Sequence, residues 1–383
     1  MTARQFYIML WITTISLKVQ KLPSIIYDGL GKDGYLLLLA YFVIDVIGIV
    51  LAFFILKKLK QNSLAPQTTS TFLNVLKKVL VFVVVVYFLA QGLLLYESIQ
   101  NLFEHILFDN LSWKVFSLLL IFAVFYLANT GIKNMARNFE LYAVVIFVSY
   151  VIIAIFGATK ADFTTVFPFQ TINVNKILDK FVDFNLWFGD FFLILFMGNH
   201  ARKIKLKWSL VVYSFAISFL LLLYIELNGI YGVYTSMKPS LITTITEQSM
   251  LGLNIGRVDW FLILFTEIGT ILSCAVCIYF ASKCLKFIFP KVKRTYLLII
   301  VMLALYLINV YYLQDTHMRE VIFTGYMSYV SAFAKWGSFL LMLLACVLKN
   351  NKKNIKEMHK KNNKNKNMLS KNNAKGSEAC YGK

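Results

Sequence analysis

Several stretches of this chain are too apolar and too long for the interior of a water-soluble protein. The clearest are VLVFVVVVYFLAQGLLLY at 79–96 and SLVVYSFAISFLLLLYIEL at 209–227. A helix needs about 20 mostly apolar residues to cross the hydrocarbon core of a bilayer. Hydrophobic residues make up 59% of the chain and charged residues 15%, against roughly 45–50% and 25% in soluble domains. We therefore expect an all-α membrane protein.

Ten segments have the length and the apolar character that a membrane-crossing helix requires. The expected spans are 5–27, 34–57, 78–100, 111–130, 138–158, 180–201, 208–233, 257–282, 294–313 and 323–348. Lysine and arginine divide unevenly between their connections. Alternate connections, together with Arg4 and the C-terminal segment, hold 28 of the 39 basic residues, and the other connections hold eight. Because basic loops stay in the cytoplasm, both termini are expected there.

The C-terminal segment, residues 349–383, is rich in lysine and asparagine. It holds 11 lysines but only two acids, Glu357 and Glu378. Such a composition buries too little apolar surface to fold. We expect a disordered cytoplasmic tail that anionic lipid headgroups attract, after a membrane domain at 1–348. The net charge of +20 therefore does not predict a nucleic-acid partner.

Two of the ten spans are irregular, and they stand five apart. Pro23 follows a polar stretch in the first span, and Gly189-Asp190 interrupts the sixth. In lipid, unwound backbone is tolerated only where it is buried or lines a cavity, and transporters built from inverted repeats place broken helices at such positions. The pattern favours a 5+5 inverted-repeat fold with broken helices 1 and 6 and with repeats at about 5–158 and 180–348. The alternative is two continuous, kinked helices.

Several segments resemble the spore germination permeases, the GerAB-like B subunits of nutrient germinant receptors, within the amino acid–polyamine–organocation superfamily. The resemblance spans about residues 3–348 and is carried by ARQFYIML, KLPS and GKDGYL around the first span, TGIKNMARNFELYAVVIF, FGDFFLILF, and GRVDWFLILFTEIGTILSCAVCIYF. It implies a LeuT-like transporter fold, sensing of amino acids or similar nutrients in the spore inner membrane, and assembly with an A-type membrane subunit and a C-type lipoprotein subunit. The first span departs from the family: Thr13, Thr14 and Ser16 stand where a glycine-containing break is usual.

Ionisable side chains within the spans each cost about 2.5–3.5 kcal/mol on insertion, so each needs a partner or a task. The expected coupling or ion-pair residues are Lys18, Asp45, Glu226, Glu267 and Lys335. Asp190 matches an acidic position of the family's sixth-span motif, and we expect it to contact a ligand ammonium group or to titrate. A helix cap or a structural ion pair is the alternative. Lys18 or Lys335 could stand in for a sodium ion, or could form a salt bridge with Asp45, Asp190 or Glu267.

Polar residues of spans one, three, six and eight are the candidates for lining a cavity at mid-membrane. The expected ligand-binding residues are Thr13, Thr14, Ser16, Tyr87, Gly189, Asp190, Thr266 and Thr270. Hydroxyls in membrane helices can instead bond to the carbonyl one turn earlier. Arg137 and Glu140 share a helix face, so they are expected to pair with each other or at the inner gate.

The sequence shows no hydrolase or phosphate-binding motif, so we expect no enzyme activity and no cofactor. Cys274 and Cys277 form a CxxC inside the apolar run ILSCAVCIYF, which does not suit a metal or redox site. The leading hypothesis is the B subunit of a nutrient germinant receptor. A proton-coupled amino acid permease and a scaffold without a ligand are the alternatives.

Overall fold

The computed structural model describes residues 1–58, 71–106, 113–165, 174–237, 259–312, 321–340 and 342, and every regular element in these ranges is helical. The long helices are α3 (Gly34–Lys58), α4 (Thr71–Ile106), α5 (Trp113–Thr130), α6 (Ile132–Lys160), α9 (Leu206–Tyr231), α11 (Asp259–Ile288) and α12 (Arg294–Tyr312). Shorter helices are α1 (Ala3–Val19), α2 (Leu22–Leu30), α7 (Val174–Phe181), α8 (Asp190–Gly198) and α14 (Met327–Ala332). The C-terminal segment, 349–383, lies outside the described residues.

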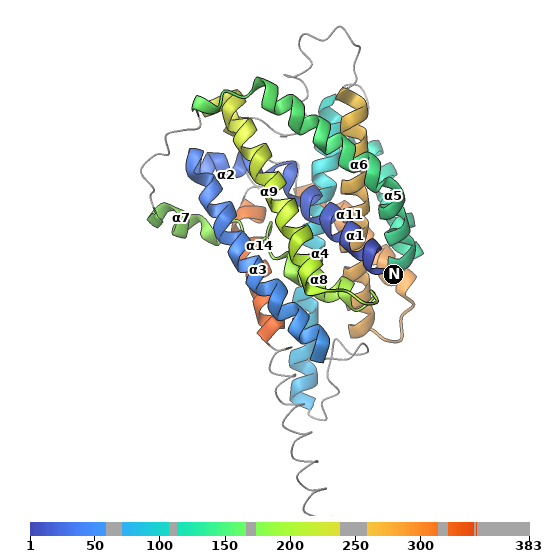
Figure 1. Cartoon of the computed structure of the whole chain (residues 1–383). Coiled ribbons are helices and arrows are strands. Elements are labelled where there is room, and N and C mark those ends of the chain that lie inside the picture. Colours follow the sequence, from blue (N-terminus) through green and yellow to red (C-terminus); the bar gives the residue numbers. More distant parts are fainter. Residues whose placement is uncertain are drawn as a thin grey trace, which may run out of the picture.

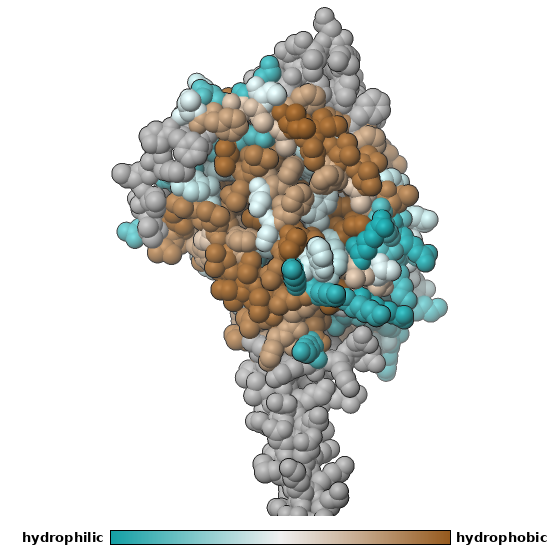
Figure 2. All heavy atoms as spheres, viewed as in Figure 1, coloured by the Kyte–Doolittle hydropathy of each residue, from teal (hydrophilic) through white to brown (hydrophobic). Residues whose placement is uncertain are grey.

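Six stretches of helix are long and apolar enough to cross a bilayer. They are Leu22–Lys57, Lys78–Gln100, Ile132–Lys160, Leu206–Tyr231, Leu262–Ile288 and Arg294–Tyr311. A shorter apolar helix covers Val115–Thr130, where a span at 111–130 was expected. Large apolar side chains cover much of the visible surface, and polar residues gather towards the end that carries the N-terminus (Figure 2).

Helices α4 and α11 form the centre of the molecule and pack along each other (Figure 1). On one side α11 is covered by α5 and α6, and on the other side α9 packs against α3. Helix α1 crosses between these groups, because it contacts α6, α9 and α11. Most of α1 is buried on all sides, since every residue from Met9 to Val19 is buried.

Both expected interruptions are present as breaks in the helices. Helix α1 ends at Val19, and α2 begins two residues later at Leu22. Pro23 is the second residue of α2, where its missing N–H costs nothing. Helix α7 ends at Phe181 and α8 begins at Asp190, with a chain of turns between them.

The location of the first break differs from one expectation. Thr13, Thr14 and Ser16 do not lie in unwound backbone, because α1 continues through all three. The Thr13 hydroxyl donates to the carbonyls of Met9 at 2.7 Å and Leu10 at 3.1 Å. A threonine that bonds to its own preceding turn is compatible with an intact helix, so the hydroxyl-rich sequence does not mark the break.

The start of α1 is fixed against the cytoplasmic ends expected for α6 and α8. Glu140 on α6 binds Arg4 at 3.1 Å and the side-chain amide of Gln5 at 2.9 Å. Among the described residues no pair joins Glu140 to Arg137, which is exposed, and pairing at the inner gate stays a prediction. The N-terminal amine donates to the carbonyl of His200 at 2.9 Å.

Candidate functional site: buried charges at two helix breaks

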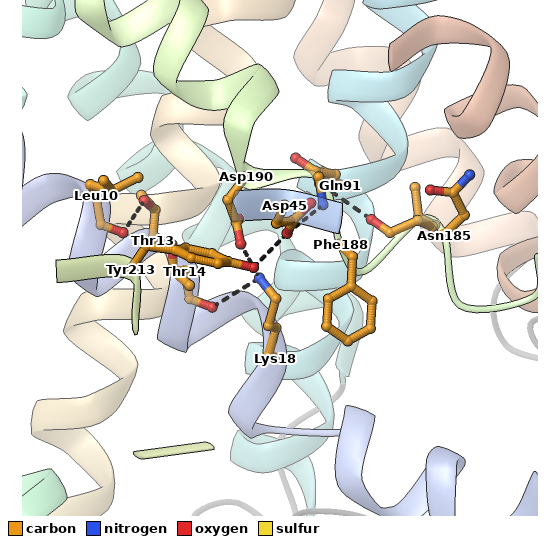
Figure 3. Close-up of polar contacts among 12 residues, drawn as sticks. Leu10, Thr13, Thr14, Lys18, Asp45, Gln91, Asn185, Phe188, Asp190 and Tyr213 are labelled. Carbon is orange, nitrogen blue, oxygen red and sulfur yellow. Dashed lines mark hydrogen bonds and ion pairs between the residues drawn. The ribbon is translucent and has the colours of Figure 1, made fainter. Parts of the chain in front are cut away.

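The two helix breaks are joined by an ion pair. Lys18 lies in the last turn of α1, and Asp190 is the first residue of α8. Lys18 Nζ is 2.6 Å from Asp190 Oδ2, and the two side chains are 0% and 1% exposed. Figure 3 shows the two groups pointing at each other across the gap between their helices. Of the alternatives for Lys18, the structure therefore shows a salt bridge with Asp190.

Asp45 on α3 holds the start of α8 from the other side. Its Oδ2 accepts the backbone N–H of Gly189 at 3.1 Å and the hydroxyl of Tyr213, on α9, at 2.5 Å. A carboxylate at a helix N-terminus satisfies a donor that would otherwise be unpaired. Figure 3 shows Asp45 next to the Lys18–Asp190 pair. Tyr213 was not among the expected site residues, because one tyrosine among 21 carries no distinguishing pattern.

Lys335 holds the turns that precede α8. It lies in a π-helical turn, Phe333–Gly337, and is 0% exposed. Its Nζ donates to the carbonyls of Phe188, at 2.5 Å, and of Asn185. Gly189 adopts a φ of +98°, and a Cβ at this position would lie 2.4 Å from Lys335 Cδ. Glycine is therefore required here both for its backbone angle and for the close approach of Lys335.

Lys18, Asp45, Asp190 and Lys335 together form what we call the central charge cluster. Each of the four side chains is at most 1% exposed. Two positive and two negative charges make the cluster neutral, which a buried set of ions requires. Its members come from α1, α3, α8 and the π-helical turn at Phe333–Gly337, so the cluster ties together four segments far apart in the sequence.

Unsatisfied polar groups surround the central charge cluster. Tyr87 on α4 lies beside it, with its ring centroid 5.5 Å from Lys335 Nζ. Within the described part of the chain, Tyr87 Oη, Thr14 Oγ1 and Trp187 Nε1 are buried and have no hydrogen-bond partner. Thr14 also presents its carbonyl to Lys18 at 3.4 Å. Buried polar groups are usually paired, so the unpaired hydroxyls of Tyr87, whose ring lies beside Lys335, and of Thr14, whose carbonyl accepts from Lys18, indicate a site for a polar ligand or water.

Comparison with protein families decides what kind of protein carries this cluster. The family model described as spore germination protein, a spore permease family, matches residues 1–318. The chain belongs to this family. With its apolar helices, it is an integral membrane protein of the permease type that functions in spore germination. No curated protein sequence matches the chain.

Two further polar residues of the first break bind acids of other helices in this spore germination protein. The side-chain amide of Gln20 donates to Glu267 Oε1 on α11. Lys21 Nζ is 2.6 Å from Glu97 Oε1 on α4. The first break thus reaches three acids on three helices, counting the pair of Lys18 with Asp190. Neither Gln20 nor Glu97 was expected in the site. A neutral glutamine does not stand out as an ionisable group within a span, and Glu97 lies near the end of its span rather than at its middle.

The remaining expected residues lie apart from the central charge cluster. The hydroxyls of Thr266 and Thr270, on α11, donate to carbonyls of their own helix, those of Ile263 at 2.8 Å and Thr266 at 3.4 Å. Glu226 on α9 is buried, and neither of its oxygens has a partner among the described residues. Both cysteines of the CxxC contact α4: Cys274 Sγ donates to the Gly92 carbonyl at 3.4 Å, and Cys277 Sγ donates to Gln91 Oε1 at 3.9 Å. No group of three His, Cys, Asp or Glu residues that could hold a metal ion occurs in the described ranges.

Proposed function

We propose that this spore germination protein is the B subunit of a nutrient germinant receptor and binds an amino acid at the central charge cluster. Family membership supports the receptor role. The observation that carries the binding site is the buried pair of Lys18 and Asp190, which lies between two helix breaks.

An amino acid matches this pair in charge. Its carboxylate can replace Asp190 at the Lys18 ammonium, and its ammonium can replace Lys18 at the Asp190 carboxylate. The exchange keeps the buried site neutral, and a buried ion pair gains little net energy over alternatives that also satisfy its charges. The free hydroxyls of Thr14 and Tyr87 and the Trp187 N–H supply further hydrogen bonds.

Insertion of a ligand between Lys18 and Asp190 separates the end of α1 from the start of α8. This fits the proposed 5+5 inverted-repeat fold of ten helices, in which the first helix of each repeat is broken at the substrate site. The ligand favours the separated arrangement only by its difference in affinity for the two arrangements. In our proposal the A-type and C-type subunits respond to this rearrangement in the spore inner membrane, with both termini of the B subunit in the cytoplasm.

The test measures binding of labelled amino acids to spore membranes that contain the complete receptor, together with germination. Lys18→Met and Asp190→Asn should each abolish binding and the nutrient response while the protein remains in the membrane. Asp179→Asn is the matched control, because Asp179 is an exposed acid on α7, and it should respond like the wild type. Normal germination of both site variants would refute the proposed site. Strong uptake into vesicles combined with normal germination of a deletion strain would favour the permease instead.

A further inference from the structure

Glu267 is a buried acid for which the structure shows no counter-charge. It lies in α11 and is 1% exposed. Its Oε1 accepts the side-chain amide N–H of Gln20. Its Oε2 has no hydrogen-bond partner among the described residues. Asp190 binds Lys18, Glu97 binds Lys21, and Asp45 belongs to the neutral central charge cluster, so the other buried acid left without a partner among the described residues is Glu226 on α9.

Two free hydroxyls accompany Glu267, and together with Gln20 they form what we call the Glu267 cluster. Tyr150 on α6 faces Glu267 and lies next to Ser16 of α1. Ser16 lies against α11, because a Cβ at Gly269 would be 3.1 Å from its Oγ. The oxygens of both hydroxyls are buried and lie close to each other, but in the described ranges neither makes a hydrogen bond of normal geometry. Three unsatisfied oxygens from α1, α6 and α11 therefore meet at one buried place.

Among the described residues, the elements packed against Glu267 bring no basic group to it. Lys18 of α1 is turned to Asp190, and Lys21, in the break that follows α1, is turned to Glu97. Between residues 78 and 100, α4 carries two charged residues, Lys78 and Glu97. Lys78 is exposed and therefore does not reach the interior. Helix α5 carries no charged residue from 115 to 130. Arg294 of α12 donates to the carbonyls of Ala128 and Asn129. On α6, the titratable group that faces Glu267 is Tyr150.

An isolated carboxylate at this depth would be very costly, so the position requires one positive charge. Hard metal cations collect about six or more oxygen ligands, whereas the cluster offers three free oxygens, those of Glu267, Ser16 and Tyr150. A proton needs only one acceptor. On Glu267 Oε2 it supplies a donor to a neighbouring hydroxyl oxygen, while Oε1 continues to accept from Gln20.

We propose that the Glu267 cluster is a binding site for one exchangeable proton, carried by Glu267. On release the proton passes to water and leaves the carboxylate behind. Gln20 connects this site to the central charge cluster, because it stands in the first helix break, two residues after Lys18. Movement of the break on nutrient binding would take Gln20 from Glu267 and change proton occupancy. This link rests on the proposed function, whereas the proton site itself does not.

Infrared spectroscopy of the full chain in lipid nanodiscs, without nutrient and at neutral pH, tests the proton directly. The expected spectrum contains the band of a protonated carboxyl group, which Glu267→Gln removes and which Asp179→Asn, at an exposed acid of α7, leaves in place. All spectra are recorded in a Glu226→Gln background, because Glu226 is a second buried acid whose band could overlap. If no protonated band is lost in Glu267→Gln, the proposal is overturned.

Two further arms keep the test decisive. Gln20→Leu retains Glu267 but removes the amide that donates to it, so the band of the protonated carboxyl group should shift. This variant serves if Glu267→Gln fails to fold, and an unchanged band would overturn the proposal.

In the second arm, sodium is exchanged for potassium in the buffer. A carboxylate band that depends on sodium and disappears in Glu267→Gln would replace the proton with a metal ion. Because no nutrient is present, failure here leaves the proposed nutrient site unaffected.

Discussion

Lys18 and Asp190 are 172 residues apart in the sequence, and a contact of 2.6 Å joins them in the interior. Lys18 lies in the last turn of α1 and Asp190 is the first residue of α8, so each charge also meets the partial charges of a helix end. Through this pair the two broken segments hold each other in place. Any molecule that separates the pair must satisfy both charges, and this is the basis on which we propose the pair as a binding site.

Removal of either partner should destabilise the protein strongly. Lys18→Met leaves Asp190 as a buried charge without its partner, at a cost of about 3–5 kcal/mol. The double variant Lys18→Met/Asp190→Asn removes both charges and should recover much of the loss. The thermal midpoint of the purified chain in detergent measures both effects. Equal losses in the single and the double variants would show that the pair is not coupled.

Gly189→Ala should destabilise the start of α8 by more than the backbone strain of a positive φ alone. A residue with a Cβ in this backbone region costs about 1–2 kcal/mol, and the new methyl group would also displace Lys335. Gly131→Ala is the matched control, since Gly131 has a φ of +89° and a Cβ added there would meet nothing within 4 Å. We expect a larger drop in thermal midpoint for Gly189→Ala, together with loss of the nutrient response. Equal drops would show that Lys335 adapts freely.

The breaks were predictable from sequence because they depend on local chemistry. Pro23 with its polar neighbours, and Gly189 before Asp190, disfavour continuous helix at those positions whatever surrounds them. The polar interior was predictable for a similar reason: charges such as Asp45 and Lys335 within apolar runs must be buried and paired.

The partners could not be predicted from sequence, because they are set by packing between distant segments. Lys18 had three acids within plausible reach, and only the crossing of α1 past α8 selects Asp190. Thr13 was predicted to lie near the break in the first span, but α1 continues through it and its hydroxyl bonds to the preceding turn. Gln20 and Glu97 were missed because their importance comes from Glu267 and Lys21, which lie on other segments.

Lys335→Met should loosen the turns before α8, in addition to the general destabilisation that follows from leaving the central charge cluster one positive charge short. Two buried carbonyls, those of Asn185 and Phe188, lose their donor, and each unsatisfied group costs about 1–3 kcal/mol. Hydrogen exchange should therefore rise at residues 182–189. Lys180→Met is the matched control: its pair with Asp183 is largely exposed, at 3.2 Å, and such pairs contribute at most about 1 kcal/mol. Equal exchange in the two variants would contradict the role of Lys335.

His200, in the connection between α8 and α9, should make stability depend on pH. It is partly buried, lies against Lys283, and is close to the N-terminal amine and Lys133. Burial, followed by these positive charges, lowers the pKa of His200 from 6.5 to about 4. The neutral imidazole can accept from the Lys283 ammonium, whereas the protonated ring cannot.

Between pH 6.5 and about 4 the unfolded chain binds a proton at His200 that the folded chain does not. The free energy of unfolding should therefore fall as the pH is lowered through this window, and this contribution is fully present above it. His200→Gln keeps a side-chain acceptor but cannot titrate, so its stability should depend less on pH over the same range. Thermal midpoints of the two proteins, measured across the window, give the comparison. An identical slope in wild type and variant would assign the pH dependence to other groups.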